Sequence, residues 1–203
     1  SDPEKARRFT AAMHSISARP ADALATTLDF KGIHRLLDVG GGSGALSIAI
    51  AERHPHLTCT VFDLEAICEI AKDHFGDSTA RARLNTLSGD MFSGPLPGGF
   101  DGILLSQILH DWSPDTGLQI LRKASNCLPE GGQILIHEKL VDDGGDGPLA
   151  NTLANLDMLV WTEGQQYTER ALHHLLSASG FQTIECHPTI GYWSVVTAQK
   201  GPK

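Results

Sequence analysis

The sequence is poor in cysteine and lacks any dense cluster of basic residues. Its four cysteines are scattered without a C-x-x-C pair, which argues against a disulfide framework or a zinc site, so no metal site is predicted. The net charge is −8, and the sparse Lys and Arg residues do not predict a nucleic-acid-binding face. We therefore expect a reducing, cytoplasmic location and no nucleic acid among the partners.

Long hydrophobic runs are also missing. No stretch approaches the roughly 20 apolar residues that a membrane-spanning helix needs, so no membrane partner is predicted. The chain instead has 203 residues, of which 41% are hydrophobic and 20% are charged. This length and composition suit one globular domain with a hydrophobic core.

Short apolar runs alternate with helix-patterned segments through the middle of the chain. Strands are expected at 36–39, 58–62, 84–87, 102–106 and 133–137, and helices at 44–53, 65–74 and 114–126. This alternation predicts βαβ units around a parallel sheet. In such a sheet, ligands bind at the carboxyl ends of the strands.

The two ends of the chain depart from this alternation. Residues 4–28 read as helical, with an apolar stripe of Phe9, Met13 and Ile16 and an interruption at Pro20. Near the other end, helices at 149–160 and 168–179 precede strands at 181–186 and 192–198. The short connection between these two strands cannot hold a crossover helix, so they should be antiparallel neighbours. The predicted fold is α/β and Rossmann-like, with a mostly parallel sheet, a C-terminal antiparallel strand pair and helices on both faces.

A glycine-rich loop at residues 38–44, DVGGGSG, follows the first predicted strand and opens a helix. Glycines let the backbone turn sharply and let a ligand approach the main chain. Gly40, Gly42 and Ala45 satisfy the dinucleotide-binding pattern G-x-G-x-x-G/A. The same loop is equally that of S-adenosylmethionine (SAM) methyltransferases, so the loop alone leaves both cofactors open.

Two carboxylates stand just beyond later strands. Asp63 follows the second strand, and an ionised carboxylate there can accept from both hydroxyls of a ribose. The alternative is that Asp63 caps the helix beginning near Glu65. Asp90 follows the third strand and can accept from an adenine amino group, while Met91 can pack on the ring. The alternative there is a turn with a core Met-Phe pair.

His110 lies beyond the fourth strand, and Glu138 ends the fifth. If these strands are neighbours, the carboxylate can bind one imidazole nitrogen and fix the tautomer of the other. The pair would then be a general base with the group that orients it. The alternatives are a structural histidine, and a Glu138 that pairs with Lys139 or caps a turn.

These residues stand in blocks that resemble the catalytic domain of the plant-type and acetylserotonin-type O-methyltransferases. The matching blocks are LDVGGGSG at 37–44, FDL at 62–64, GDMF at 89–92, ILHDW at 108–112 and MLVWTEG at 158–164. They occur in family order and cover nearly the whole chain. The His-Asp-Trp block separates this family from other SAM enzymes.

The resemblance implies a SAM-binding enzyme with specific site residues. The residues it implies for the cofactor are Gly40, Gly42, Asp63, Leu64, Asp90, Met91, Ser106 and Ser17. It makes His110 the proton acceptor with Glu138 in support, and it puts Met13 beside the methyl-transfer site.

Three positions depart from the family pattern. Ser106 stands where many members have a lysine near the cofactor, and Gln166 where many have a second glutamate beside the histidine. Asp157 stands where melatonin-type relatives have an asparagine that faces the substrate, which could favour a different or basic acceptor. A glutamine can orient an imidazole but cannot stabilise its cation by charge.

The function that the resemblance implies is SAM-dependent methyl transfer to a hydroxyl, expected to be phenolic, of a small aromatic molecule. Residues 1–30 are expected to be a helical segment that contributes to the active site, and residues 31–203 the SAM-binding catalytic domain. The family's N-terminal dimerisation domain is expected to lie outside this chain, with a homodimer or a partner domain in the full-length protein. The alternatives are a degenerate SAM-binding domain, C- or N-methylation, and a nicotinamide oxidoreductase, for which no Tyr-x-x-x-Lys set is present.

Overall fold

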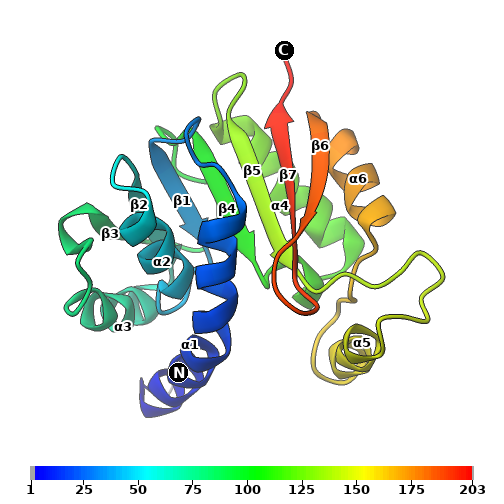
Figure 1. Cartoon of the computed structure of the whole chain (residues 1–203), viewed down its shortest axis with the longest axis horizontal. Helices are drawn as coiled ribbons and strands as arrows, with labels where there is room; N and C mark the ends of the chain where they lie inside the picture. Colours follow the sequence, from blue (N-terminus) through cyan, green and yellow to red (C-terminus); the bar gives the residue numbers. More distant parts are fainter. Residues whose placement is uncertain (1–2, 203) are drawn as a thin grey trace.

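The computed structural model describes residues 3–202, without the side chains of Pro3 and Leu159. It has a seven-stranded sheet in the order β3-β2-β1-β4-β5-β7-β6 (Figure 1). The strands are β1 (Arg35–Val39), β2 (Thr58–Asp63), β3 (Leu84–Ser88), β4 (Gly102–Ser106), β5 (Gln133–Glu138), β6 (Phe181–Pro188) and β7 (Ser194–Lys200). Strands β1 to β5 are parallel, and β7 is antiparallel to both β5 and β6. The predicted mostly parallel sheet with a closing antiparallel pair is confirmed.

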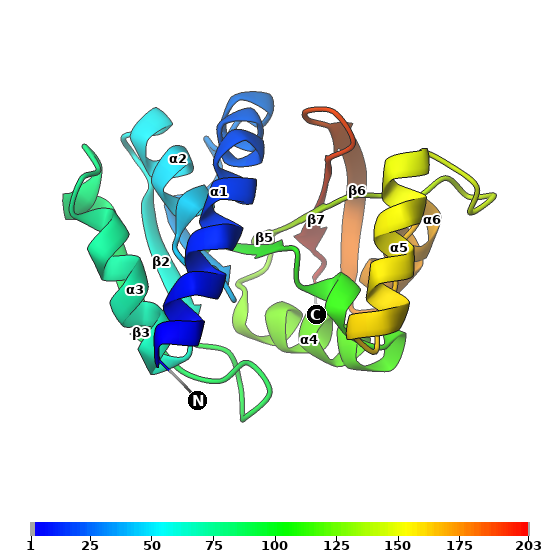
Figure 2. The same ribbon diagram turned by 90° about the horizontal axis from the view of Figure 1, so that it is seen from below.

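Helices cover both faces of the sheet, as predicted (Figures 1 and 2). One face carries α1 (Pro3–Thr27), α2 (Ala45–Arg53) and α3 (Glu65–Phe75), and the other carries α4 (Pro114–Cys127) and α6 (Glu169–Ala178). Helix α5 (Leu149–Trp161) stands apart from both layers, across from α1 (Figure 2). Short 3₁₀ helices η1 (Arg81–Arg83) and η2 (Leu109–Asp111) precede β3 and α4.

Alternating side chains of the central strands build two hydrophobic cores. Leu36 on β1 belongs to the core under α1 and α2, together with Leu24 and Ile50. The next residue, Leu37, belongs to the core under α4 and α6, together with Leu121. Successive residues of a strand point to opposite faces, so apolar runs without alternation are the pattern of a sheet covered on both sides.

The predicted interruption of the first helix at Pro20 is wrong. Helix α1 is continuous from Pro3 to Thr27 and has Pro20 inside it. A proline within a helix costs about 3 kcal/mol because it removes one N–H donor and crowds the preceding turn. Leu24, one turn later, is fully buried, and Ala21 and Ala25 lie beside it. Burying a leucine side chain contributes about 1.5–3 kcal/mol, so packing against the sheet offsets most of this cost.

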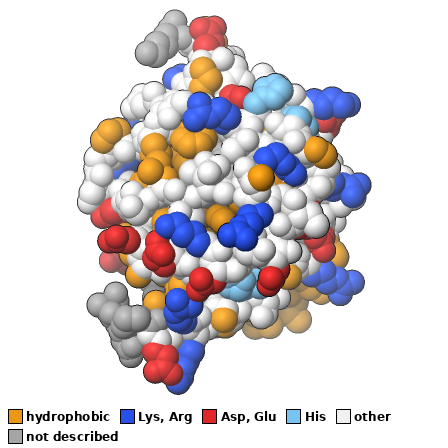
Figure 3. Space-filling view, turned by 90° about the vertical axis from the view of Figure 1, so that its left-hand side faces the viewer, with side chains coloured by type: hydrophobic (Ala, Val, Ile, Leu, Met, Phe, Trp, Pro, Cys, Tyr) orange, Lys and Arg blue, Asp and Glu red, His pale blue; other side chains and the backbone are white. Residues whose placement is uncertain are grey.

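The surface fits the charge pattern of the sequence. On the face shown in Figure 3, the described Lys and Arg side chains are interspersed with Asp and Glu, without a continuous basic patch. No helix in the described part of the chain is long and apolar enough to cross a membrane.

Candidate active site

The glycine loop turns sharply between β1 and α2. Gly40 and Gly42 have φ angles of 68° and 58°, in the left-handed region that favours glycine. A Cβ atom on Gly40 would lie 2.5 Å from Cδ1 of Ile108 and 3.2 Å from Cε of Met91. Glycine at position 40 therefore lets β1 pass close to the segments that follow β3 and β4.

Asp63, the last residue of β2, is tied to this loop. Its Oδ2 accepts a hydrogen bond from the Gly42 N–H at 3.0 Å, and its Oδ1 accepts from the Leu64 N–H at 2.7 Å. Burial raises the pKa of Asp63 above its usual value, against the effect of these two bonds. The alternative role as a helix cap is wrong, because the N-cap of α3 is Leu64 and no side chain caps it.

Asp38 is a further carboxylate of the site, and the sequence reasoning gave it no role of its own. It is almost fully buried in β1, and its Oδ2 accepts from the Ser47 hydroxyl at 2.7 Å. Burial raises its pKa to about 7, and the charge of Asp63 adds to the rise. A Cβ on Gly41 would lie 2.6 Å from the carboxyl carbon of Asp38, so the loop rests directly on this group. The available signal was an acidic residue inside an otherwise apolar strand.

A cavity of about 240 Å³ lies between the glycine loop, α1 and the segment after β4. Helix α1 contributes Met13 and Ser17 to its wall, which also includes Asp38, Asp63 and Ser106. Met13 is half-buried, while Phe9 and Ile16 of the predicted apolar stripe are 66% and 53% exposed. The stripe therefore borders the cavity mouth and does not enter the core.

Gln107 also lines the cavity, and sequence reasoning missed it. Its φ of 56° is left-handed, a conformation that L-residues with a side chain adopt at a cost of about 1–3 kcal/mol. The Gln107 side chain donates to the Ser17 hydroxyl at 3.2 Å, which ties α1 to the end of β4. The neighbouring Ser106 hydroxyl lies 3.0 Å from Nδ1 of the buried His137. Burial lowers the pKa of His137 to about 4, so this histidine is neutral.

His110 and Glu138 are brought together because β4 and β5 are parallel neighbours that end at the same edge. His110 Nδ1 lies 2.5 Å from Oε2 of Glu138, which is 1% exposed. A carboxylate only accepts, so Nδ1 carries the hydrogen and the lone pair of a neutral ring is on Nε2. The other carboxylate oxygen accepts from the Ile108 N–H at 3.2 Å, which fixes Glu138 in place.

The protonation of His110 is set by opposing influences. Burial lowers its pKa, but the charge and hydrogen bond of Glu138, with a smaller contribution from Asp111, raise it above the usual value. His110 Nε2 lies 3.5 Å from Oδ1 of Asp111, which itself lines the cavity. His110 is not itself on the cavity wall, and Asp111 is its nearest lining neighbour. Gly164, after α5, packs so closely that a Cβ there would collide with the carbonyl oxygen of His110.

Asp90 and Leu64 do not line this cavity. Asp90 is exposed and accepts from the Phe92 N–H at 2.9 Å and from the Ser93 hydroxyl at 2.7 Å, bonds that lower its pKa. These contacts form a local turn. Leu64 is 57% exposed beside Asp63. Met91 does not line the cavity either, but its Cε lies against Gly40 at the edge of the glycine loop.

The two predicted residues near α5 are not on the cavity wall either. Asp157 is exposed on α5. Gln166 is buried, and its N–H donates to Oδ1 of Asn155 at 2.6 Å. Its side-chain oxygen has no hydrogen-bond partner among residues 3–202. The structure thus leaves both residues outside the cavity at the glycine loop.

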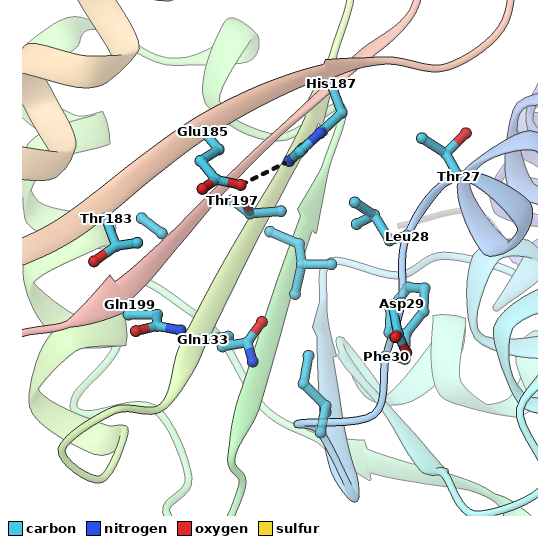
Figure 4. Close-up of a pocket in the computed structure, with 13 residues that line it drawn as sticks. Thr27, Leu28, Asp29, Phe30, Gln133, Thr183, Glu185, His187, Thr197 and Gln199 are labelled. Carbon is cyan, nitrogen blue, oxygen red and sulfur yellow. Dashed lines mark ion pairs between the residues drawn. The ribbon is translucent and has the colours of Figure 1, made fainter.

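A second groove, of about 300 Å³, lies where the end of α1 meets β5, β7 and β6 (Figure 4). Its wall mixes apolar and polar side chains and includes an exposed ion pair of 3.4 Å between Glu185 and His187. The groove lies at the start of β5, where Gln133 lines it, at the opposite end of this strand from Glu138, and none of the glycine-loop residues 38–44 lines it. The candidate active site is therefore the cavity at the glycine loop.

Comparison with known proteins identifies the family of the chain. A family model for the O-methyltransferase domain matches residues 1–182. A 3-hydroxy-5-methyl-1-naphthoate 3-O-methyltransferase from Streptomyces sahachiroi is 41% identical over 79% of this chain and 46% of its own length. The acetylserotonin O-methyltransferase of Bos taurus is 38% identical over 81% of this chain and 47% of its own length.

Solved structures agree with these matches. Human N-acetylserotonin methyltransferase in complex with SAM superposes with a TM-score of 0.92 and 31% identity, over 99% of this chain and 57% of that one. An O-methyltransferase family 2 protein of Planctomyces limnophilus in complex with apigenin superposes with a TM-score of 0.90 and 31% identity, over 98% of this chain and 62% of that one. The chain spans about half the length of the curated relatives it matches. Its fold is that of the class I SAM methyltransferases, and the chain belongs to the O-methyltransferase domain family.

Proposed function

We propose that this chain binds SAM in the cavity at the glycine loop and transfers its methyl group to a phenolic hydroxyl of a small aromatic molecule. The observation that carries the proposal is the His110–Glu138 pair, held at 2.5 Å beside that cavity. A base, the group that orients it and a glycine loop at one edge of the sheet are what such a transfer requires.

The donors and acceptors around the cavity suit the cofactor. Each carboxylate oxygen of Asp63 accepts one backbone N–H bond, from Gly42 or Leu64. Each oxygen therefore retains a lone pair that can accept from a ribose hydroxyl. Gly42 has no atom within 4 Å of the place that a Cβ would take, so its backbone is open to close approach by a ligand. The residues we assign to SAM are Gly40, Gly42, Asp63, Leu64, Asp90, Met91, Ser106 and Ser17. Asp90 and Leu64 would take part from the rim, because they are exposed.

The part played by His110 is proton removal. When bound, SAM would supply an electrophilic methyl group, and its S–CH3 bond would break to leave S-adenosylhomocysteine. Nε2 of His110 would accept the hydroxyl proton as the substrate oxygen bonds to the methyl carbon. A phenol with a pKa of about 10 facing a histidine of about 6.5 leaves a gap of roughly 3.5 units, or about 5 kcal/mol. Glu138 narrows this gap because it raises the pKa of His110. Concerted proton removal, or an acidified acceptor such as a catechol, is thus favoured over prior ionisation.

The substrate side of the site is assigned to Met13, Asp157 and Gln166. Met13 already lines the cavity. The carboxylate of Asp157 on exposed α5 would favour an acceptor that carries a basic group. Gln166 offers an unpartnered oxygen, which can accept from a donor on the substrate or on His110.

We also propose the domain arrangement expected for this family. Residues 3–30 pack as a helical segment on residues 31–202, and Met13 and Ser17 on it line the cavity. Helix α5 exposes an apolar stripe at i, i+4, i+7 and i+11, formed by Leu149, Leu153, Leu156 and Val160. A stripe of this kind fits contact with a further domain or a second copy. The four free cysteines accord with the proposed cytoplasmic location.

Calorimetry with SAM, followed by mass detection of methylated product from a panel of phenols, tests this function. We expect SAM to bind and a phenol to gain one methyl group. Binding of SAM without any methylated product would favour the alternative of a degenerate cofactor-binding domain, which the change to Gln166 motivates. Methylated carbon or nitrogen would redirect the assignment of the acceptor.

A further inference from the structure

Two histidines from different helices stack beside the glycine loop. His14 lies on α1 and His74 near the end of α3. Their ring centroids are 4.2 Å apart, and the ring planes differ by 13°. The rings join two helices that lie far apart in the sequence, so they form one of the contacts that fix α1 over the cavity.

His14 also reaches the loop itself. Its Nδ1 lies 2.8 Å from the hydroxyl oxygen of Ser43. Ser43 is buried between Gly42 and Gly44 and lines the cavity. The other side of the loop is held by Asp63, through its bond from Gly42. His14 thus holds one side of the loop and Asp63 holds the other.

The charged groups around the stack come from α1, from α3 and from the sheet side of the loop. Arg7, two turns before His14 on the same face of α1, pairs with Asp73 of α3 at 2.9 Å. The Asp73 carboxylate is therefore already paired with the Arg7 guanidinium, and Arg7 adds positive charge on the α1 side. From the sheet side, Asp38 and Asp63 reach the underside of the loop. Burial lowers the pKa of His14, and the charge of His74 lowers it further.

We propose that His14, stacked on His74, forms a histidine clasp, which holds α1 and Ser43 together at the cofactor loop while the His14 ring is neutral and releases them when that ring is protonated. His14 is then a positioning residue for the cofactor, acting through Ser43. The inference rests on the proposed SAM site, because the clasp acts on the loop that would hold SAM.

The direction of the pH effect follows from linkage. The docked arrangement lowers the pKa of His14, so docking is favoured when the ring is neutral, at pH values above the ordinary 6.5. Docking weakens as the pH falls below 6.5, since protons then bind better to the released ring. Cofactor affinity should therefore decrease toward acid pH.

The first test needs no ligand. Histidine signals in NMR spectra are followed against pH in the ligand-free wild-type protein and in His74→Phe, which keeps a stacked ring but cannot titrate. We expect His14 to titrate below its ordinary value in the wild type and at higher pH in His74→Phe. A His14 titration that is the same in both proteins would overturn the clasp.

The second test measures S-adenosylhomocysteine binding by calorimetry at about pH 5 and pH 8, where histidine is charged and neutral. Between pH 8 and pH 5, the wild type should lose roughly fivefold or more affinity beyond any loss shown by His74→Phe. A factor of about five is at the small end of the coupling usually found between two sites. His174→Phe on the exposed surface of α6 is the matched control and should behave as the wild type. An equal loss in wild type and His74→Phe would assign the pH effect to Asp38, Asp63 or His110 and contradict the proposal.

The positioning role of His14 has its own pair of variants. His14→Asn retains a polar group near the position of Nδ1 without its charge, so binding at pH 8 should be preserved and its pH dependence reduced. His14→Leu removes the bond to Ser43 and should weaken binding roughly fivefold, as expected for one lost hydrogen bond. Thermal unfolding establishes that both variants fold. No binding by the wild type at either pH would contradict the SAM site instead, and the ligand-free titration would still decide the clasp.

Discussion

Replacing Glu138 with glutamine separates the charge of this residue from its shape. The amide keeps an oxygen that can accept from the Ile108 N–H, as Glu138 does at 3.2 Å. It removes the negative charge that lies 2.5 Å from Nδ1 of His110. Without this charge, the lowering effect of burial is no longer offset, so the pKa of His110 falls relative to the wild type. An amide N–H aimed at Nδ1 would also favour the tautomer with its hydrogen on Nε2, which cannot accept a proton.

The expected loss is that of a general base. Positioned proton transfer contributes about 10²- to 10⁴-fold, or about 3–5 kcal/mol of activation free energy. We expect Glu138→Gln to lower kcat by this amount and to leave SAM affinity nearly unchanged, because Glu138 does not line the cavity. The pH at which kcat reaches half its plateau should also move downward, in parallel with the His110 pKa.

The assay is kcat for methylation of an accepted phenol, measured across the pH range in which histidine titrates. Glu185→Gln is a matched control, because it breaks an exposed Glu–His pair on β6 that lies outside the cavity. Unchanged turnover in Glu138→Gln, with an unchanged pH profile, would refute the view that this carboxylate orients His110 and raises its pKa.

Two further predictions concern the cofactor side. Asp63→Asn should weaken SAM binding by about 10- to 100-fold, as expected when a charged hydrogen-bond acceptor is lost at about 1.5–3 kcal/mol, and calorimetry that finds wild-type affinity would argue against a ribose role. For Asp38, the folded-state pKa of about 7 lies above the unfolded value of 3.8, so the folded state binds the proton more tightly and its stability falls as pH rises from about 4 to 7. Asp38→Asn should therefore raise the free energy of unfolding of the ligand-free protein at pH 8 by up to about 4 kcal/mol, and denaturant unfolding that shows no gain would contradict the raised pKa of Asp38.

Much of the site followed from the order of strands and helices. Asp63, His110 and Glu138 were predicted together because each stands at the carboxyl end of a strand, and parallel strands bring those ends to one edge. The glycine loop left two cofactors open. The match to the O-methyltransferase domain family decides between them in favour of SAM.

Other features depend on contacts that no local pattern encodes. The hydrogen bond between Gln107 and Ser17 joins residues 90 positions apart. The left-handed backbone of Gln107 could not be predicted from its residue type, because that conformation is usually found at glycine. Helix α1 continues through Pro20 because the burial of Leu24 against the sheet offsets the cost of the proline. The bond from His14 to Ser43 likewise arises only when α1 packs over the loop.

The most direct test of the central claim is single-turnover methylation by His110→Ala, with SAM binding measured on the same preparation. We predict that SAM binds with wild-type affinity while formation of the methylated phenol falls by about 10²- to 10⁴-fold. Methylation by His110→Ala at the wild-type rate would contradict the assignment of His110 as the base.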